Sequence, residues 1–415
     1  MRLKDVAHIN RHVFAEATDP AYSFRYIDIS AVDSRGGMTV PDELTTFDTA
    51  PSRARRLAPP GSTVVSTVRT YLRAVARVPE TDEPLVFSTG FAVVEAKPVV
   101  DERFLAYLCR SDPFIDEVVA RSVGVSYPAI NPGDLGSIGV TLPDLDEQRR
   151  LANFLDAETA RTDRLVELRT SQLDSVSAHL RSHLSQVADV LHARYGTVKV
   201  RHVLQKIEQG WSPQCEDRPA AEGEWGVVKA GCVNGGVFNP GQHKTLPAEI
   251  DPEYRYRLRA GDLLMSRASG SVDLIGSIGV LPDDLSPQLL LCDKIYRLRM
   301  DRTRMTPHFV ALMLSTHQVR EEIKLGISGA DGMANNLPTA TVTNLPLPDA
   351  PLAEQARVVG ELHDHRETAR IAKQTLADQL ALIAKRRQAL ITAAVTGQID
   401  VSTARGLSAS GGAAV

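Results

Sequence analysis

The sequence predicts an α+β protein in which two similar globular domains are separated by two long antiparallel helices, an intramolecular coiled coil with pseudo-twofold symmetry. Residues 144–195 contain no proline or glycine, and residues 352–396 contain no proline and a single glycine, Gly360. Because these two residue types are the strongest helix breakers, both stretches are expected to be long helices. A repeat of about 200 residues, too long for a solenoid, indicates two copies of one domain-plus-helix unit.

The first long helix needs a partner, which is expected in the same chain. At about 1.5 Å per residue, 144–195 would form a rod of roughly 78 Å, which is rarely stable without tertiary packing. Its apolar residues recur at three- and four-residue steps, as in a helix that packs along one face. Acidic residues outnumber basic ones by 9 to 6 over 144–193, and basic ones outnumber acidic ones by 8 to 6 over 352–415. This difference favours pairing between the two helices over self-pairing.

The composition is that of an ordinary globular protein. The chain has 415 residues, of which 43% are hydrophobic and 24% charged, and a net charge of −4. We find no secretory signal and no apolar run of about 18 residues, so a cytoplasmic protein without membrane spans is expected. The net charge does not decide for or against nucleic acid, so any basic surface must be local. Reduced thiols are expected for the four scattered cysteines, Cys109, Cys215, Cys232 and Cys292.

The two copies match best where each globular domain leads into its helix. Glu147-Gln148, in VTLPDLDEQRRLANFLDAE, corresponds to Glu354-Gln355, in LPLPDAPLAEQARVVGELH. Pro60-Gly61 and Ala260-Gly261 likewise each precede an apolar strand. Strands are expected where β-branched or aromatic residues lie between turn residues, at 26–29, 63–68, 91–94, 225–229, 262–266 and 294–298.

Five segments follow from these patterns. We expect a first globular domain over 1–143, a central long helix over 144–195, a second globular domain over 196–351 and a C-terminal long helix over 352–400. The remaining residues, 401–415, are small and polar, and they are expected to form a disordered tail.

The duplicated P-x-x-x-x-E-Q element at the start of a long helix resembles the specificity subunit of type I restriction–modification enzymes. LPDLDEQRRLANFLDAETARTDRL and RRQALITAAVTGQIDV are typical of that family, and the resemblance spans nearly the whole chain. It implies two target-recognition domains, 1–143 and 196–351, that each read one half of a split DNA sequence, with helices that fix the unread spacer. Gly360 and His363-Asp364-His365 depart from the pattern, which leaves a kinked or shortened coiled coil as an alternative there.

The resemblance also implies a non-catalytic subunit with defined partners. Such a subunit binds double-stranded DNA and recruits two modification subunits, which methylate adenine with S-adenosylmethionine. Restriction subunits, which are ATP-driven motor nucleases, join to make the restriction complex. No cofactor is therefore expected in this chain, because S-adenosylmethionine and ATP would belong to the partner subunits.

The motifs of a self-sufficient enzyme are missing. The sequence has no N-P-P-[FYW] or D-P-P-[FYW] element for adenine methylation and no G-x-x-x-x-G-K-[ST] loop for ATP. Glu95-Ala96-Lys97 lacks the upstream aspartate of a nuclease metal site. His179 and His183 have the i, i+4 spacing of zinc ligands, but no third ligand is evident, so a solvated face and no metal are expected. A coiled-coil scaffold whose domains bind proteins stays open as the alternative to a DNA-recognition subunit.

The best candidate for DNA contact in the first copy is the segment 69–77. Read as a strand, it places Arg69, Tyr71, Arg73 and Arg77 on one face. Arginine can bind phosphate or pair with guanine, and tyrosine can stack. A solvated amphipathic strand explains the pattern equally well.

Further candidates lie in the second copy and in two loops. Arg267 and Ser269 follow the strand that matches the one before Arg69, and Arg267 resembles the Ser-Arg element frequent in the family. Three more side chains that can read bases, but also serve ordinary turns, lie in corresponding loops: Tyr127, Asn335 and Asn336. A basic loop formed by Arg53, Arg55 and Arg56 could hold phosphates, although exposed surface charge is the simpler interpretation.

Overall fold

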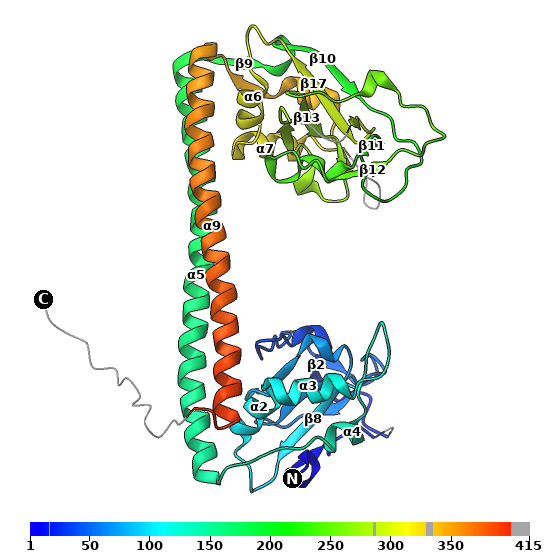
Figure 1. Ribbon diagram of the computed structural model, residues 1–415, viewed down its shortest axis with the longest axis vertical. Coiled ribbons are helices and arrows are strands. Elements are labelled where there is room, and N and C mark those ends of the chain that lie inside the picture. Colours follow the sequence, from blue (N-terminus) through cyan, green and yellow to red (C-terminus); the bar gives the residue numbers. More distant parts are fainter. Residues whose placement is uncertain (16, 285–287, 329–334, 400–415) are drawn as a thin grey trace, which may run out of the picture. The chain divides into compact units, whose positions relative to one another are not determined.

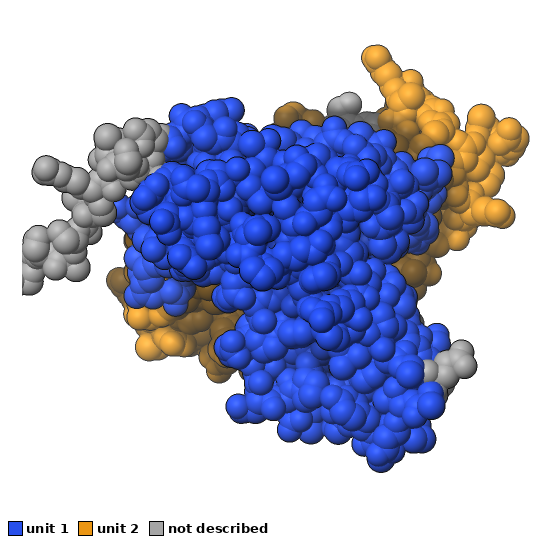
Figure 2. All heavy atoms as spheres, turned by 90° about the horizontal axis from the view of Figure 1, so that it is seen from below, with its two compact units in different colours: residues 1–170, 376–415 blue, residues 171–375 orange. Residues whose placement is uncertain are grey.

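The computed structural model describes residues 1–15, 17–284, 288–328 and 335–399 (Figure 1). They form two compact units: unit 1 is Met1–Thr170 with Leu376–Val415, and unit 2 is Ser171–Thr375 (Figure 2). Because this division runs through both long helices, the five-segment boundaries stay a prediction. The tail expected over 401–415 lies outside the described residues.

The two long helices form where the sequence predicts them. Helix α5 is Leu145–Tyr195 and helix α9 is Leu352–Val395, which runs on unbroken through Gly360. The sequence left a kinked or shortened coiled coil open at this point, and the structure has one continuous helix there. Gly397, with φ +73°, follows the end of α9, a backbone conformation that favours glycine. No helix in the described part of the chain combines the length and apolar character needed to cross a membrane.

The helices pair antiparallel within each unit. In unit 1, Leu155 of α5 and Ile391 of α9 share one hydrophobic core. In unit 2, Leu184 of α5 and Leu362 of α9 share another. In unit 1 the first half of α5 thus packs with the second half of α9. In unit 2 the second half of α5 packs with the first half of α9. The prediction of an α+β fold with two long helices flanked by globular domains is confirmed.

Unit 1 contains two four-stranded sheets. The first has the order β1-β8-β5-β6 and is antiparallel, and the second has the order β3-β2-β7-β4 with β2 parallel to β7. The strands are β1 Ala7–Ile9, β2 Ser23–Ile27, β3 Thr45–Thr46, β4 Ala54–Leu57, β5 Thr63–Ser66, β6 Val75–Arg77, β7 Leu85–Ser88 and β8 Phe91–Ala96. The helices are α1 Leu3–Val6, α2 Glu102–Arg110, α3 Asp112–Ala120 and α4 Pro132–Gly136, with 3-10 turns at Ile29–Ala31 and Thr70–Leu72.

Strand β5 shows that the first sheet of unit 1 lies between a layer of helices and the second sheet. Its residues are all buried, and they alternate between two cores. Val65 packs with Phe104 of α2, whereas Val64 packs with Phe87 of the second sheet. Helices therefore cover one face of the first sheet and the second sheet covers the other.

Unit 2 repeats this arrangement. Its two larger sheets have the orders β10-β17-β13-β15 and β12-β11-β16, with β11 parallel to β16, and two further sheets pair β14 with β18 and β19 with β9. The strands are β9 Thr197–Lys199, β10 Leu204–Gln209, β11 Trp225–Val228, β12 His243–Thr245, β13 Leu263–Ser266, β14 Ala268–Ser269, β15 Ile278–Val280, β16 Gln288–Leu290, β17 Ile295–Met300, β18 Asn335–Asn336 and β19 Pro346–Pro348. The helices are α6 Pro307–Met313, α7 His317–Leu325 and α8 Thr339–Asn344, with 3-10 turns at Val200–His202, Ala230–Gly236, Tyr254–Tyr256 and Val272–Leu274.

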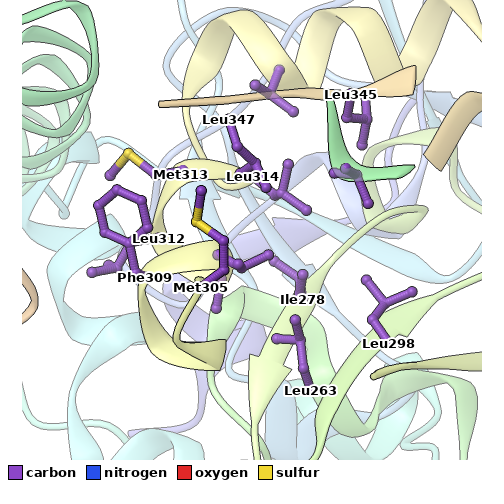
Figure 3. Close-up of a cluster of buried hydrophobic side chains, with 14 of the residues drawn as sticks. Leu263, Ile278, Leu298, Met305, Phe309, Leu312, Met313, Leu314, Leu345 and Leu347 are labelled. Carbon is purple, nitrogen blue, oxygen red and sulfur yellow. The ribbon is translucent and has the colours of Figure 1, made fainter. Parts of the chain in front are cut away.

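The core of unit 2 shows the same middle layer. Leu263 of β13 lies in one hydrophobic core with Phe309 and Leu312 of α6 (Figure 3), whereas Leu264 belongs to the core of the second sheet. Gly61 and Gly261, with φ of +83° and +72°, hold matched turns before β5 and β13. The predicted duplication of the globular domain is thus visible in the first sheet of each unit, where the orders β1-β8-β5-β6 and β10-β17-β13-β15 correspond.

The glutamines of the two matched Glu-Gln elements have a structural role. Gln148 is 1% exposed; its Oε1 accepts the Asp101 N–H at 2.9 Å and its Nε2 donates to the Pro143 carbonyl at 2.9 Å. Gln355 is fully buried and makes the matching bonds, at 2.9 Å to the Thr306 N–H and at 2.8 Å to the Ala350 carbonyl. Each glutamine therefore ties the start of a long helix to the start of α2 or α6.

Candidate nucleic-acid interface

In unit 1 the structure brings Arg69 and Tyr127 together. The Arg69 N–H donates to the Pro128 carbonyl at 2.8 Å, and Val68 pairs with Ala129, so the two loops are held side by side. The Arg69 guanidinium lies 4.6 Å from the centre of the Tyr127 ring, within cation–π range. Tyr127 is 64% exposed and Tyr71 is 54% exposed. Arg69 and Tyr127 thus offer a cation and an aromatic ring side by side, and Tyr71 is a second exposed ring two residues along the chain from Arg69.

The expected strand over 69–77 is wrong. Arg69 and Arg73 adopt left-handed backbone conformations, with φ of 49° and 57°, on either side of the 3-10 turn Thr70–Leu72. Thr70 is buried, and its hydroxyl is 2.8 Å from that of Ser122. Because the backbone reverses here, side chains do not alternate between two faces, and only Val75–Arg77 forms a strand.

Two of the four predicted contact residues form ion pairs within unit 1. Arg73 forms an ion pair with Asp112, which also accepts a hydrogen bond from Thr392 of α9 at 3.0 Å. Arg77 forms an ion pair with Glu102 at the start of α2. These contacts give Arg73 and Arg77 a structural part in holding the helices to the sheet. Arg69 and Tyr71 are the members of this set best placed to meet DNA.

Unit 2 builds the same loop contact from different side chains. The Leu337 N–H donates to the Arg267 carbonyl at 2.8 Å, as the Ile130 N–H donates to the Thr67 carbonyl at 2.9 Å. Strand β14 pairs with β18, so that Ser269 lies opposite Asn335. By this register, Ser269 corresponds to Arg69.

The other predicted residues of unit 2 lie beside this contact. Asn336 pairs with Ala268. The Arg267 guanidinium donates to the Asp293 carbonyl at 3.3 Å and lies 5.9 Å from the Tyr296 ring centre. Arg267 is therefore anchored within unit 2 next to the polar pair formed by Ser269 and Asn335. The two units thus place Arg69 and Ser269 at matched positions, with Tyr127 beside the first and Asn335, which matches Pro128, beside the second.

Arg53, Arg55 and Arg56, for which the sequence left a phosphate-holding loop open beside the simpler interpretation of surface charge, do not form a loop together, because Arg55 and Arg56 lie on β4. Arg53 forms an ion pair of 2.7 Å with Asp28. Arg55 lies over Phe47, 4.9 Å from the ring centre, and burial lowers the pKa of Arg56. The three cations do not form one open cluster for phosphate.

One arginine–aromatic surface was missed in the sequence. Tyr254-Arg255-Tyr256-Arg257 places Tyr254 against Trp225 at 5.5 Å between ring centres. Arg257 lies 5.6 Å from the Trp225 ring centre, and Tyr254 is 67% exposed. Alternating arginine and tyrosine was the signal that could have found it, since both side chains stack on bases.

Comparisons with known proteins first identify the class of protein that this chain resembles. Residues 1–174 match the family model of the Type I restriction modification DNA specificity domain. This match confirms the resemblance to the specificity subunits of type I restriction–modification enzymes.

Particular relatives agree with that class. The chain is 21% identical over 328 residues to the type I restriction enzyme EcoKI specificity subunit of Escherichia coli (strain K12), covering 75% of this chain and 69% of that protein. It is 25% identical over 167 residues to the EcoEI specificity subunit of Escherichia coli, covering 40% of this chain and 28% of that protein.

Two solved structures share the fold. The HsdS subunit from Thermoanaerobacter tengcongensis is 24% identical, with a TM-score of 0.50, covering 96% of each chain. A chain from a study of complex assembly and conformational transition of the type I R-M system is also 24% identical, with a TM-score of 0.72. That alignment covers 96% of this chain and 97% of the other.

Proposed function

We propose that this chain is the DNA sequence-specificity subunit of a type I restriction–modification enzyme and that it is not itself catalytic. It binds double-stranded DNA at a bipartite target, one half-site for each globular domain. The observation that carries this proposal is the matched loop contact of the two units. Arg69 in one unit and Ser269 in the other occupy corresponding places in a shared backbone arrangement, and each lies against a paired loop that presents a further polar or aromatic side chain, Tyr127 or Asn335.

Different side chains at matched places suit two different half-sites. Arginine pairs with guanine or with phosphate, whereas asparagine pairs with adenine. A split target with a constant gap also needs a spacer of fixed length, because half-site separation on DNA is a geometric quantity. The continuous helices α5 and α9, of 51 and 44 residues, are suited to that role.

The partners follow from the proposed class. The chain recruits two modification subunits, which use S-adenosylmethionine to methylate adenine, and restriction subunits, which use ATP. It holds neither cofactor itself and acts in the cytoplasm. The names of the relatives, which are specificity subunits of type I restriction enzymes, support this assignment.

Methylation mapping tests the proposal. The chain is expressed with the modification subunit encoded beside it, and the DNA is sequenced for modified adenines. We expect a split motif with a fixed gap that disappears when this chain is deleted. Modification that persists unchanged without the chain would contradict the proposal and leave the protein-binding scaffold as the better account.

The predicted DNA contacts make the test sharper. Replacing Arg69 and Tyr127 by alanine should weaken modification through the first half-site and leave the bases of the second unchanged. Replacing Ser269 and Asn335 should do the reverse. Loss of both half-sites from either pair would show that the two units do not read DNA independently.

A further inference from the structure

Three potential metal ligands converge on the helix pair of unit 2. His183 comes from α5, and Glu361 and His365 come from α9. Glu361 and His365 are four residues apart, so they share one face of their helix. One ligand atom from each of the three residues lies within 4.8 Å of the others. The Nδ1 atoms of His183 and His365 are 3.2 Å apart.

We propose that His183, Glu361 and His365 bind a divalent transition-metal ion, with Zn²⁺ as the best match. Zinc binds imidazole nitrogen at about 2.0–2.1 Å in a tetrahedron, which puts two ligand nitrogens about 3.3 Å apart. The observed separation of 3.2 Å matches this distance. Two imidazoles and one carboxylate suit zinc, whereas Mg²⁺ and Ca²⁺ favour sites built from oxygen ligands.

The carboxylate can join the site at little cost to its present contacts. Glu361 accepts a hydrogen bond from Arg357 at 2.8 Å through Oε2, which leaves Oε1 for a metal. Arg357 is also held by Glu354, at 2.9 and 3.0 Å. Its guanidinium therefore keeps a partner even if Glu361 turns fully toward the ion.

We assign the fourth position of the tetrahedron to water, because His179 lies outside the cluster of three ligands. His179 precedes His183 by one helical turn, and the two ring centres are 6.5 Å apart. A hydrogen bond between the imidazoles of His183 and His365 would explain their approach on its own. It would not explain why a carboxylate from the preceding turn of α9 lies within 4.8 Å of a ring nitrogen of each histidine.

The ion would join the two long helices beside Gly360. Glycine is the residue, apart from proline, that most weakens the middle of a helix. Nothing lies within 4 Å of the place where a side chain on Gly360 would start. A metal ion held by both helices would therefore stiffen α9 at Gly360. At this position the sequence has a low helix propensity and no neighbouring side chain among the described residues packs.

The test uses the untagged full-length chain, stripped with a chelator and titrated with ZnCl₂ alone. We expect one equivalent to bind by calorimetry and to raise the midpoint of thermal unfolding. Co²⁺ in place of Zn²⁺ should give the visible absorption of a tetrahedral site with nitrogen and oxygen ligands. His183→Ala and His365→Ala should each weaken zinc binding at least about tenfold, because each removes one ligand.

His363→Ala is the matched control, since His363 lies on the same helix, two residues from both Glu361 and His365, and outside the cluster. It should leave zinc affinity unchanged, although the chain contains 11 histidines. Equal affinity in wild type and His183→Ala, or an equal loss in His363→Ala, would overturn the proposal. If an alanine variant loses helical circular dichroism, His183→Gln and His365→Gln provide the same comparison with a side chain of similar size.

Discussion

Arg69 lies over Tyr127, with its guanidinium carbon 4.6 Å from the centre of the ring. The two residues are 58 positions apart and come from separate loops, which meet through the hydrogen bond from the Arg69 N–H to the Pro128 carbonyl. Stacking holds a long cationic side chain in one orientation, which reduces the entropy lost when it binds DNA. This pair is the best-defined candidate for base or phosphate contact in unit 1.

Arg69→Ala should weaken DNA binding by the assembled complex by about tenfold or more, as expected for the loss of one specific arginine contact. Affinity is measured at a fixed, moderate salt concentration, because phosphate contacts depend on salt. Arg2→Ala, which removes an exposed arginine from α1's N-terminal side, is the control. If the Arg69→Ala complex binds DNA with unchanged affinity, Arg69 is an ordinary surface charge and not a DNA contact.

Arg73→Ala should act on stability more than on DNA binding. Arg73 pairs with Asp112, which is also bonded to Thr392 of α9. Because the pair is partly exposed, its loss should lower the free energy of unfolding by only about 1 kcal/mol. Denaturant unfolding measures this change. A large fall in DNA affinity with no change in stability would instead make Arg73 a contact residue.

Gln148→Ala and Gln355→Ala should each lower the free energy of unfolding by about 2 kcal/mol. Each change leaves a backbone N–H and a backbone carbonyl, both at least partly buried, without their side-chain partner. Arg150→Ala, which breaks an exposed ion pair in the first turns of α5, should have a smaller effect. Equal losses from Gln148→Ala and Arg150→Ala would contradict a structural role for the glutamine.

Unit 2 should lose stability in acid through Glu208. Burial alone would raise the pKa of Glu208, but hydrogen bonds from Lys206 and Arg297 lower it from 4.5 to about 2. A carboxylate with a lowered folded-state pKa stabilises the fold above its unfolded-state pKa. This contribution should therefore be complete above pH 4.5 and disappear as the pH falls toward about 2.

Glu208→Gln tests the acid dependence directly. The substitution should remove part of the loss of stability between pH 4.5 and 2, measured by urea unfolding across that range. At neutral pH it should cost about 3 kcal/mol, because the side chain of Arg297 is 1% exposed and depends on Glu208 and Asp262. The exposed Glu222→Gln is the control. An unchanged pH profile in Glu208→Gln would rule out this carboxylate as the cause.

The parts of the fold that depend on local pattern could be predicted from the sequence. The lack of helix breakers over 144–195 and after Leu352 was enough to place α5 and α9. The matched Glu147-Gln148 and Glu354-Gln355 showed the duplication, although the sequence did not show that both glutamines are buried. The apolar strand pattern also placed β5 and β13 within one or two residues.

The candidate site was harder to predict because it depends on the backbone and on long-range contacts. Alternation over 69–77 indicated a strand, but Arg69 and Arg73 have left-handed conformations that arginine seldom adopts. The ion pair of Arg73 with Asp112 joins residues far apart in the sequence. The approach of His183 to Glu361 and His365 likewise depends on the register of two helices, which spacing within one helix does not reveal.

The central claim is that two domains read two half-sites and that the paired helices set the gap between them. The most direct measurement is methylation mapping of a chain with seven residues, two helical turns, inserted after both Thr170 and Thr375. These are the points where the chain passes from one compact unit to the other. At about 1.5 Å per residue, the account predicts unchanged half-sites and a gap longer by about 3 base pairs. Altered half-site bases with a constant gap would contradict it.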